Sequence, residues 1–584
     1  MNAAHFDLRP HAGNSTTLMG VLDQRAREAP DRVLYRFLRE GELETDSLTA
    51  GELRRRALRI AAELTARGAT GERALLLYPQ GLAFLSAFFG CLYAGVVAVP
   101  VSLPSRKRGF EALQRVTEDA DAKWLLSTSE FIERFSVAAP GAALPERLCL
   151  LASDELESSP GAARPVCEPG PQDPALIQYT SGTTGPARGV VVTHDNLVDN
   201  HRQVARALNG HAESVYVSWL PMFHDMGLGI ALQAVSVGAQ AILMPPRSFV
   251  QEPRRWLAAI SRYRGTISGG PDFAFELCAA RISQAECEGL DLSSWRVAYN
   301  GSEPVRAETL VQFSRRFAGS GFRHEAFQPV YGLAEATLLV SSEPPAEPPI
   351  VRRFSAEALE QGEARLADGE RARPLVSVGR PWPGTRVKIV DPETREECPA
   401  NRVGEIWIQG RSVAAGYFER ESETRASFAA GLAHAQGCFF RSGDLGVIVE
   451  GRLFVVGRQR DALVVGDRTY YPQDIEATAS QCHAALAPHG AAAFSLGATE
   501  DVVVVQEVSR SALRTVDADE VMRAIRAAVR REHGLDVTAV LIKPATLPRT
   551  TSGKVQRRRC RAAYLDQALS LLPTFSAAAS GASG

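Results

Sequence analysis

The stretch Tyr179–His194, YTSGTTGPARGVVVTH, sets the fold of this chain because it joins a glycine-rich polar loop to a β-branched run. Glycine lets backbone N–H groups come close to an anion, and serine and threonine hydroxyls add hydrogen-bond donors. The sequence therefore predicts a phosphate-binding loop leading into a strand, with a plain polar surface loop as the alternative. A Walker A loop is not predicted, because its order of Gly, four residues, Gly, Lys and then Ser or Thr is absent.

An uncharged segment, 74–105, precedes this loop, and its part 83–101 is long enough by residue count to span a bilayer. However, Pro79, Gly90 and Gly95 interrupt the segment, and the runs on either side are strand-like. We therefore expect a strand, a buried helix and a strand of a parallel sheet, with no stable membrane insertion.

Helical and strand patterns alternate over the first part of the chain. Helical periodicity occurs at 16–29, 49–67 and 196–208, and a strand-like run occurs at 215–219. Such alternation predicts an α/β fold with parallel sheets.

Composition narrows the class of protein. At 584 residues the chain is too long for one hydrophobic core, so at least two domains are expected. Lys plus Arg number 65 against 67 for Asp plus Glu, which argues against nucleic acid and leaves small molecules or proteins as partners. Nine scattered cysteines without a CxxC pair argue against disulfides and zinc and favour a reducing cytoplasm. The start, MNAAHFDLRPHAG, has neither the basic beginning nor the apolar core of a signal peptide.

Three polar turns follow strand-like runs further along: NGSEP (300–304), YGLAE (331–335) and RSGDLG (441–446). Ligands bind to such a sheet at the carboxyl ends of its parallel strands. In these turns Tyr331 offers a flat face for a base, and Glu335 offers a hard oxygen ligand for magnesium.

Two further residues invite a role. Asp444 stands in a tight turn, where it could accept two hydrogen bonds from a ribose diol. His224 stands beside Asp225 at the expected start of a helix and could meet a carboxylate substrate. A lone histidine is more often structural, so His224 carries little weight alone.

The regular pattern fails at 341–377, which is rich in proline and charge and contains one short helical stretch near 356–360. It could be a solvated insertion. After a charged turn at 457–461, strands and helices alternate to about Leu565 and lead into the basic turn LPRTTSGKVQRRR (547–559). No internal repeats are visible, and the small-residue tail is expected to be disordered.

Taken together, these stretches resemble the adenylate-forming superfamily of acyl-CoA synthetases, peptide-synthetase adenylation domains and luciferases. The resemblance runs from about Thr16 to Leu565 and is carried by the ordered set YTSGTTGPARG, NGSEP, YGLAE, RSGDLG, GRQRD and TSGK. Within the superfamily, SWLPMFHDMGLG, TISGGPDFAFELC, YGLAEATLLVSS and YYPQDIE look like the fatty acyl-AMP ligases, whose insertion falls where 341–377 stands here.

The resemblance implies a fold and domain limits. The fold is α/β, with a large N-terminal adenylation domain of parallel α/β sheets plus a β subdomain, and a small mobile α+β C-terminal domain. The implied limits are 1–457 for the AMP-binding domain, 458–461 for a hinge, 462–570 for the lid domain and 571–584 for a disordered tail.

The resemblance also implies site residues. Arg188 replaces the usual lysine and keeps its charge, and Ala334 replaces a threonine whose hydroxyl contacts the α-phosphate in many relatives. Glu335 would bind Mg²⁺, and Arg460 and Asp461 sit at the hinge. The loop residues that would hold the ATP phosphates with Arg188 are Thr180, Ser181, Gly182, Thr183, Thr184 and Gly185. The residues that would surround adenine and ribose are Ser302, Glu303, Tyr331, Gly332, Asp444 and Arg458.

Lys554 of TSGK would be the lysine that acts during adenylation. Because a fatty carboxylate and ATP are both anionic, positioning and charge neutralisation must supply most of the acceleration. Arg188 would serve the departing pyrophosphate, Lys554 would bridge the carboxylate and the α-phosphate, and His224 would lie near the carboxylate. The alternative for Lys554 is a solvated basic tail, since five arginines surround it between 549 and 561.

The implied function is Mg²⁺-dependent activation of a medium- or long-chain fatty acid by ATP, followed by transfer to the phosphopantetheine thiol of an acyl carrier protein. A fatty acyl-CoA synthetase is the first alternative, and a non-catalytic nucleotide- or lipid-binding homologue is the second. No carrier-like Asp-Ser-Leu segment follows the last domain, so the carrier is expected to be a separate chain.

Overall fold

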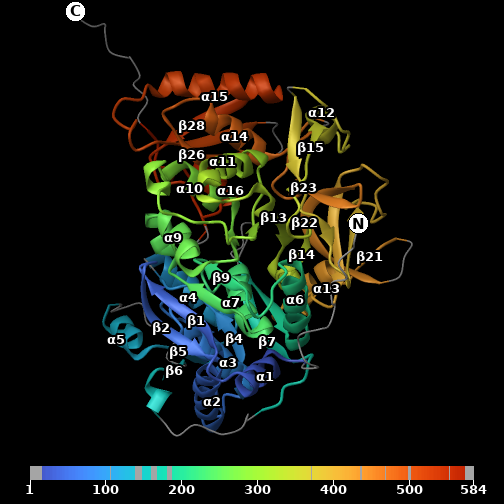
Figure 1. Cartoon of the computed structure of the whole chain (residues 1–584). Coiled ribbons are helices and arrows are strands. Elements are labelled where there is room, and N and C mark those ends of the chain that lie inside the picture. Colours follow the sequence, from blue (N-terminus) through green and yellow to red (C-terminus); the bar gives the residue numbers. More distant parts are fainter. Residues whose placement is uncertain are drawn as a thin grey trace, which may run out of the picture.

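A computed structural model describes residues 16–104, 107–138, 148–158, 167–180, 187–369, 371–433, 437–466, 468–497, 501–550 and 553–572. The N-terminal α/β layers (blue and green) lie at one end of the molecule, the β subdomain (yellow to orange) at one side, and the C-terminal domain (orange to red) at the other end (Figure 1). This arrangement confirms the predicted fold class.

The first layer is a seven-stranded sheet of order β20-β8-β7-β4-β3-β5-β6. The pairs from β7 to β6 are parallel, whereas β7 pairs with β8, and β8 with β20, in antiparallel fashion. Its strands are β3 (Arg73–Leu76), β4 (Val97–Pro100), β5 (Trp124–Ser127), β6 (Cys149–Ala152), β7 (Pro174–Thr180), β8 (Arg188–Thr193) and β20 (Gly416–Tyr417).

The second layer is a nine-stranded sheet of order β17-β14-β13-β12-β11-β9-β10-β1-β2. The run from β13 to β1 is parallel, so the turns after β11, β12 and β13 meet at one edge. Its strands are β1 (Val33–Arg39), β2 (Leu43–Thr49), β9 (Val215–Ser218), β10 (Gln240–Leu243), β11 (Ile267–Gly270), β12 (Val297–Asn300), β13 (Phe327–Gly332), β14 (Leu339–Ser342) and β17 (Arg380–Pro381).

Within the described ranges eleven helices accompany these two sheets, and α1, α2 and α6 end close to the limits predicted for them. One cluster of buried side chains runs through both layers, so they share a core. The helices are α1 (Leu18–Glu28), α2 (Ala50–Ala66), α3 (Ala83–Ala94), α4 (Lys107–Asp119), α5 (Ser129–Ala138), α6 (His194–Ala207), α7 (Asp225–Val237), α8 (Pro246–Gln251), α9 (Arg254–Tyr263), α10 (Asp272–Arg281) and α11 (Ala307–Phe317).

The uncharged segment forms β3, α3 and β4, as predicted from its prolines and glycines. Residues 84–94 of α3 are all buried, because α2 and the first sheet cover the helix. Of the described helices, none combines the length and the apolar character needed to cross a membrane.

The β subdomain contains β18 (Thr385–Val390), β19 (Gly404–Gly410), β21 (Ala430–Gly431), β22 (Cys438–Val449), β23 (Arg452–Arg458) and α13 (Glu421–Phe428). The segment 341–377 is more regular than its composition suggested. It folds as β15 (Val351–Ser355) and β16 (Ala372–Val376), which pair antiparallel, with α12 (Ala356–Glu360) after β15. Phe354, Leu359 and Leu375 bury against Phe454 and Val456 of β23, so this segment shares a core with the β subdomain.

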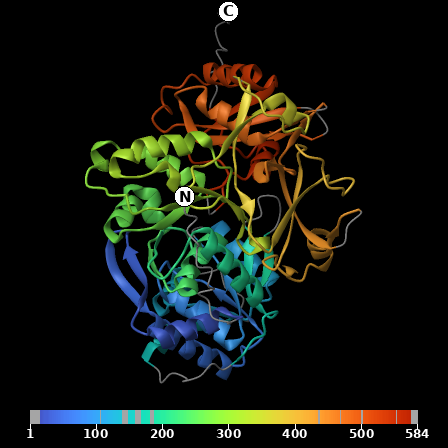
Figure 2. The same ribbon diagram turned by 45° about the vertical axis from the view of Figure 1, so that its right-hand side comes forward.

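The C-terminal domain is α+β, as predicted, and has buried clusters of its own. It lies over the green helices of the large domain (Figure 2). Residues 571 and 572 still pair with β28, and 573–584 lie outside the described residues. Its elements are β24 (Leu463–Val465), β25 (Arg468–Tyr470), α14 (Pro472–Gln481), β26 (Leu486–Ser495), β27 (Val502–Val508), α15 (Ala518–His533), β28 (Val537–Ile542) and α16 (Arg557–Leu565).

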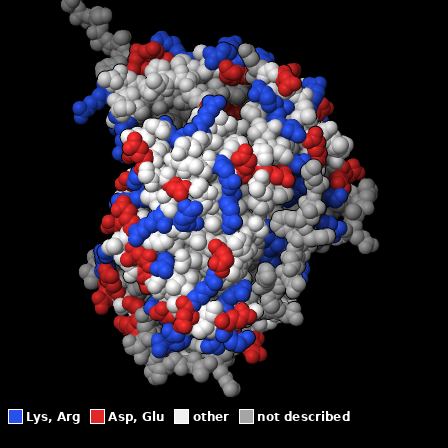
Figure 3. Space-filling view, in the orientation of Figure 1, with Lys and Arg blue, Asp and Glu red and all other residues white. Residues whose placement is uncertain are grey.

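Charged side chains of both signs are interspersed over the face seen in Figure 3. This mixture agrees with the near-equal totals of 65 basic and 67 acidic residues. No broad field of one sign covers this face, so the surface here offers no general attraction for a polyanion.

Candidate active site

The predicted phosphate loop connects β7 to β8. The two strands pair antiparallel up to Thr180 and Arg188, which face each other at the mouth of the loop. Ser181, Gly182, Thr183, Thr184 and Gly185 lie outside the described residues. The base of the loop is thus a two-stranded hairpin that fixes where the loop leaves and re-enters the sheet.

Arg188 is held by two groups that lie outside the phosphate loop. Its Nε lies 2.9 Å from Glu423 of α13, and its guanidinium lies 5.0 Å from the centre of the Tyr417 ring. Tyr417 is in β20, which pairs with β8, and its hydroxyl donates to Glu335 at 3.1 Å. A short chain of contacts therefore joins Arg188 to Glu335, the predicted phosphate cation to the predicted magnesium ligand.

Glu335 lies in a single 3-10 turn, Ala334–Ala336, directly after β13. Burial raises the pKa of its carboxyl, while Tyr417 and Arg458 lower it. The turn needs Gly332, because a Cβ at that position would lie 1.8 Å from the carbonyl oxygen of Leu338. The backbone thus folds back tightly and holds Glu335 in a half-buried position.

Tyr331, Asp444 and Arg458 form a second cluster. The Tyr331 hydroxyl donates to one oxygen of Asp444 at 2.9 Å, and Arg458 Nε donates to the other at 2.9 Å. Asp444 and Arg458 face each other across β22 and β23. The charge of Asp444 raises the pKa of Arg458, and the paired groups are well placed to meet hydroxyl groups.

Ser302 and Glu303 lie in the turn after β12. Ser302 has φ of 71°, in the left-handed region that residues other than glycine seldom adopt. Glu303 accepts a hydrogen bond of 2.8 Å from the Phe273 backbone N–H at the start of α10. The carboxylate therefore ties this turn to the beginning of the neighbouring helix.

Lys554 comes from the C-terminal domain and lies at the place where these clusters meet. Burial lowers the pKa of its ammonium, Asp225 raises it and Arg458 lowers it. The carboxylates of Glu303 and Asp444 also raise the pKa of the Lys554 ammonium. The basic turn is therefore not a solvated tail in this structure, and its lysine faces residues from four segments of the large domain.

His224 precedes α7 and lies in the same region. Burial lowers the pKa of its imidazole to about 4, with Asp225 raising it and Lys554 lowering it. His224 is therefore neutral near pH 7. A neutral imidazole can lie beside an incoming carboxylate without adding a formal charge.

A rigid hairpin carries Lys554. Residues Arg549 and Val555 pair across it, the Thr550 N–H donates to the Lys554 carbonyl at 2.8 Å, and the Thr550 hydroxyl accepts from the Lys554 N–H at 3.0 Å. Gly553 adopts φ of 87°, which its lack of a side chain permits. The backbone around the lysine is thus fixed by its own hydrogen bonds.

The turn 458–461 joins the two domains. The Gln459 N–H donates to the Gly443 carbonyl at 2.9 Å, on the side of the large domain. Asp461 instead pairs at 2.9 Å with Arg557, which also binds Glu476 of α14. The two ends of the turn are therefore anchored to different domains, with Arg460 exposed between them.

The structure adds residues that the sequence reasoning missed. Tyr417 and Glu423 reach Arg188 because β20 pairs with β8. No local sequence motif predicts this pairing. A pocket beside α7 was also missed because distant segments line it. Its apolar lining is Leu176, Val192, Leu197, Leu228, Leu232 and Leu338, and Gln178 and Asp225 add polar groups.

Comparison with known proteins identifies the family of this chain. A family model described as AMP-binding enzyme matches residues 22–418, and one described as Disco-interacting protein 2-like, AMP domain, matches 460–573. The chain belongs to the AMP-binding enzyme family. This confirms the resemblance predicted from its motifs.

Several relatives match over nearly the whole chain. JamA of Moorena producens, named a medium-chain fatty acid–acyl carrier protein ligase, is 42% identical, covering 95% of this chain and 96% of its own length. TtuA of Teredinibacter turnerae, also named a medium-chain fatty acid–acyl carrier protein ligase, is 34% identical, covering 93% of this chain and 92% of its own length. A fatty acyl-adenylate ligase from L. pneumophila, solved with acyl adenylate and pyrophosphate, is 36% identical with a TM-score of 0.75, covering 96% of this chain and 98% of that one.

Proposed function

We propose that this chain activates a medium- or long-chain fatty acid with ATP to acyl-AMP and then passes the acyl group to the phosphopantetheine thiol of an acyl carrier protein. The observation that carries the first step is the position of Lys554 among Asp225, Glu303, Asp444 and Arg458. The relatives named as fatty acid–acyl carrier protein ligases support the second step.

In the first step a carboxylate oxygen attacks the α-phosphorus of ATP. The bond from that phosphorus to pyrophosphate breaks, and pyrophosphate leaves with the electron pair. Negative charge builds between two anions, so Lys554 acts by neutralising charge at the reacting atoms. Asp444 and Arg458 hold the ribose hydroxyls, the Tyr331 ring lies along adenine, and Arg188 with the loop 180–185 receives the phosphates.

The residues fit a magnesium ion bound mainly by phosphate oxygens. Among the described residues no group of three His, Cys, Asp or Glu side chains could hold a metal by itself. Glu335 offers a half-buried carboxylate, one oxygen of which accepts from Tyr417. Glu335 would therefore be the protein ligand of a Mg²⁺ ion that neutralises phosphate charge, since Mg²⁺ takes few carboxylates and keeps phosphate and water ligands.

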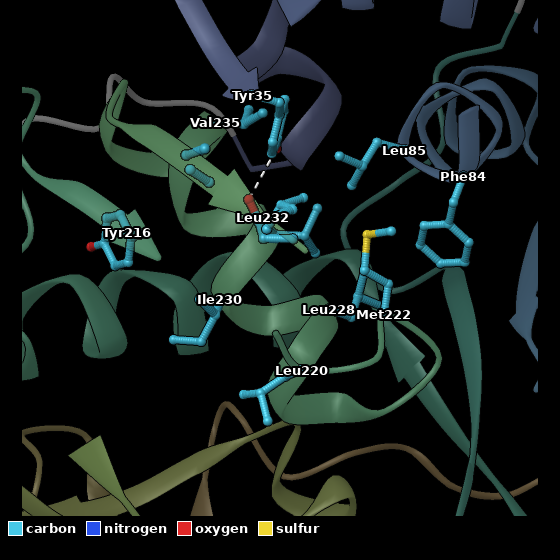
Figure 4. Close-up of a cluster of buried hydrophobic side chains, with 14 of the residues drawn as sticks. Tyr35, Phe84, Leu85, Tyr216, Leu220, Met222, Leu228, Ile230, Leu232 and Val235 are labelled. Atoms are coloured by element: carbon cyan, nitrogen blue, oxygen red, sulfur yellow. Dashed lines mark hydrogen bonds between the residues drawn. The ribbon is translucent and has the colours of Figure 1, made fainter. Parts of the chain in front are cut away.

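The acyl chain would enter the pocket beside α7. Leu228 and Leu232 lie on one side of this helix within the cluster of buried side chains seen in Figure 4. Asp225, at the start of α7, lines the pocket and also acts on Lys554. The lining of this pocket is mainly apolar, as the wall of an alkyl-chain site must be.

The acceptor of the second step is a carrier thiol rather than CoA. When this thiol attacks the acyl carbonyl carbon, the bond to AMP breaks and the thiol proton passes to solvent. The insertion supports the carrier because it contacts the small domain: Arg373 of β16 lies 3.0 Å from Asp474 of α14, and Arg468 lies 3.3 Å from Glu360 of α12. These contacts favour the present domain arrangement over the one a CoA ligase needs for thioester formation.

A cytoplasmic location completes the proposal. All nine cysteines of the chain are free thiols, which suits a reducing compartment. A separate carrier chain and a supply of ATP would be met in the same compartment.

The test uses purified protein with ATP, Mg²⁺ and a series of fatty acids of increasing length, with acyl-AMP, acyl-CoA and acylated holo carrier measured separately. We expect acyl-AMP to accumulate with CoA present and acylated carrier to form when a suitable holo carrier is added. Rapid, stoichiometric acyl-CoA formation would favour the acyl-CoA synthetase instead. Nucleotide binding without any adenylate for any acid would favour the non-catalytic homologue.

A further inference from the structure

His489 stands at an irregular point of β26. Its φ of 52° lies in the left-handed region, which is uncommon for residues other than glycine. The pairing of β26 with β27 also shifts register between Leu486 and Ala491. An irregularity of this kind redirects a side chain out of the strand, and backbone strain of this kind concentrates where it serves a function.

The ring of His489 leaves its own domain and contacts the large one. Arg306, which follows the turn after β12, donates to Nδ1 at 2.8 Å. Nε2 lies against the carboxylate of Glu276 on α10. Because a guanidinium only donates hydrogen bonds, Nδ1 accepts and Nε2 carries the proton that points to Glu276. The imidazole therefore bridges a cation and an anion of the large domain.

Arg306 and Glu276 are partly exposed, and a buried carboxylate, Asp272, lies behind them. Arg306 Nη1 lies 3.5 Å from Glu276, and its Nε lies 3.9 Å from Asp272, a fully buried carboxylate. Asp272 also accepts from the Arg306 N–H at 3.2 Å and from Asn300 at 2.9 Å. The groups that receive His489 are thus fixed in the large domain before the small domain reaches them.

The backbone of His489 holds the hairpin of Lys554. The His489 carbonyl accepts from Arg549 at 2.5 Å, and Arg549 donates from its other terminal nitrogen to the Gly553 carbonyl at 2.9 Å. Gly553 directly precedes Lys554. One residue therefore binds the large domain with its ring and the catalytic hairpin with its carbonyl.

We propose that His489 is a positioning residue for acyl-AMP formation: its ring clamps the small domain onto Glu276 and Arg306, so that Arg549 holds Lys554 at the reacting phosphate. The inference rests on the proposed function, in which Lys554 acts on the α-phosphate. A displacement of about 1 Å at a catalytic group can cost on the order of 10²-fold in rate. The clamp belongs to the adenylating arrangement alone, since rotation of the small domain must break it.

The first test separates the two half-reactions. His489→Ala should lower the kcat of acyl-AMP formation by roughly 10- to 100-fold with little change in KM for ATP, because substrate contacts are untouched. Transfer from supplied acyl-AMP to a holo carrier should keep its rate. His489→Gln, whose amide can also accept and donate, should recover part of the loss. Equal slowing of both half-reactions, or unchanged adenylation, would overturn the proposal.

The second test asks whether His489 acts through Lys554. In a Lys554→Ala background, His489→Ala should add less than about a twofold further loss, since coupled residues are not additive. A full additional loss would overturn the proposal. His533→Ala is the matched control: its ring bonds Thr478 within the small domain at 2.8 Å, and we expect both half-reactions to continue.

The third test needs no activity. Arg460 is exposed in the turn between the domains, and trypsin cleaves after arginine. His489→Ala should be cut at the turn faster than the wild type and His533→Ala, because the released small domain leaves the turn less restrained. An unchanged cleavage rate would count against the clamp. Absence of acyl-AMP from the wild type would reject the proposed function, while this cleavage rate would still decide the role of His489.

Discussion

In the proposed function Lys554 acts through its positive charge and its position in the site. Both determine how its replacement should affect adenylation. It lies among the carboxylates of Asp225, Glu303 and Asp444 and near Arg458. Carboxylates without a partner cation would repel an incoming fatty carboxylate and triphosphate. In the proposed function the lysine therefore balances these carboxylates and meets the charge that builds during adenylation.

Lys554→Ala should lower acyl-AMP formation by on the order of 10²- to 10³-fold, the usual loss when a preorganised group aimed at developing charge is removed. ATP should still bind, because Asp444, Arg458 and the phosphate loop remain. Single-turnover rates and ATP binding measured separately check this expectation. Lost ATP binding with an unchanged rate in the bound complex would show that Lys554 serves binding instead.

The pH dependence of the adenylation rate should reflect deprotonation of Lys554. Burial holds the pKa of Lys554 below its ordinary 10.5, so the ammonium is present at low pH and is lost as pH rises through that lowered pKa. The rate should therefore decline on the alkaline side earlier than an exposed lysine would allow. Lys554→Arg stays protonated there, so its slower reaction should lack this decline. A decline that persists in the variant would belong to another group.

Glu335→Gln should raise the Mg²⁺ concentration needed for half-maximal adenylation, because a neutral amide is a poorer ligand for a hard cation. The amide oxygen can still accept from Tyr417, so the turn itself should be preserved. A magnesium titration of both proteins provides the measurement, with Tyr417→Phe as the control for that hydrogen bond. Superimposable titrations would argue that Glu335 does not meet the metal.

Sequence alone could place Glu335 in a turn after a strand, because that turn carries local signals of glycine and acid. The tight turn predicted at Asp444 was wrong: Asp444 lies within β22, where it pairs with Arg458, and Tyr331 lies at the end of β13. Sequence alone could not find Tyr417 or Glu423, whose roles come from β20 pairing with β8 across more than two hundred residues. It also could not find His489, which depends on an irregular strand and on a partner in another domain.

At the scale of elements, the turn between β23 and β24 decides how the two half-reactions alternate. Lys554 must occupy the site for adenylation, yet a carrier thiol needs access from the same face, so the small domain has to move between steps. Gln459 and Asp461 are anchored on opposite sides, which concentrates this movement near Arg460.

Arg460→Pro should impair transfer more than acyl-AMP formation, because proline fixes φ near −65° and limits the rotation. In the proposed function the arrangement seen in the structure is the adenylating one, so acyl-AMP formation should depend less on that rotation. Rates of acyl-AMP formation and of transfer from supplied acyl-AMP to a holo carrier, with Arg460→Ala as the control, make the comparison. Equal loss in both steps would mean that the turn is structural only.

In the insertion, 341–377, the sequence pattern predicted the helix but not the strands. Its short helix, α12, was predicted from periodicity, but β15 and β16 were missed because arginines and a proline fill these strands. Their order comes from pairing with each other and from burial of Phe354 and Leu375 against β23. Such long-range packing has no signature within the segment.

At the scale of the whole molecule, Arg373 connects the insertion to the small domain in two ways. It pairs with Asp474 at 3.0 Å, and its guanidinium lies 4.9 Å from the centre of the Tyr471 ring. Partly buried contacts of these kinds are each worth about 1 kcal/mol. Together they bias the small domain toward the adenylating arrangement.

Arg373→Ala should therefore raise the rate at which acyl-AMP is passed on, by up to about tenfold, since about 1.4 kcal/mol corresponds to a factor of ten. Carrier and CoA should be tried as separate acceptors, and Arg352→Ala, on the neighbouring strand β15, serves as the control. If the variant gains transfer to the carrier but none to CoA, the insertion is not what excludes CoA. The exclusion would then lie in the surface that would have to receive CoA.

The fold as a whole was accessible from the sequence, because alternating helix and strand patterns and ordered motifs persist over most of the chain. The position of the C-terminal domain on the large domain could not be predicted from the sequence. That placement depends on a few contacts such as Arg306 with His489, and single polar residues in loops carry no pattern that pairs them.

The separate buried clusters of the two domains have a consequence for heating. One cluster runs through both sheets of the large domain, whereas most buried apolar side chains of the C-terminal domain form two clusters of their own, and Tyr471 packs in a cluster shared with β15, β16 and β23. Each core can melt as its own cooperative unit, joined to the other mainly by polar contacts that water can replace. A single free energy of unfolding is then not defined for this chain, and a melting temperature describes whichever domain opens first.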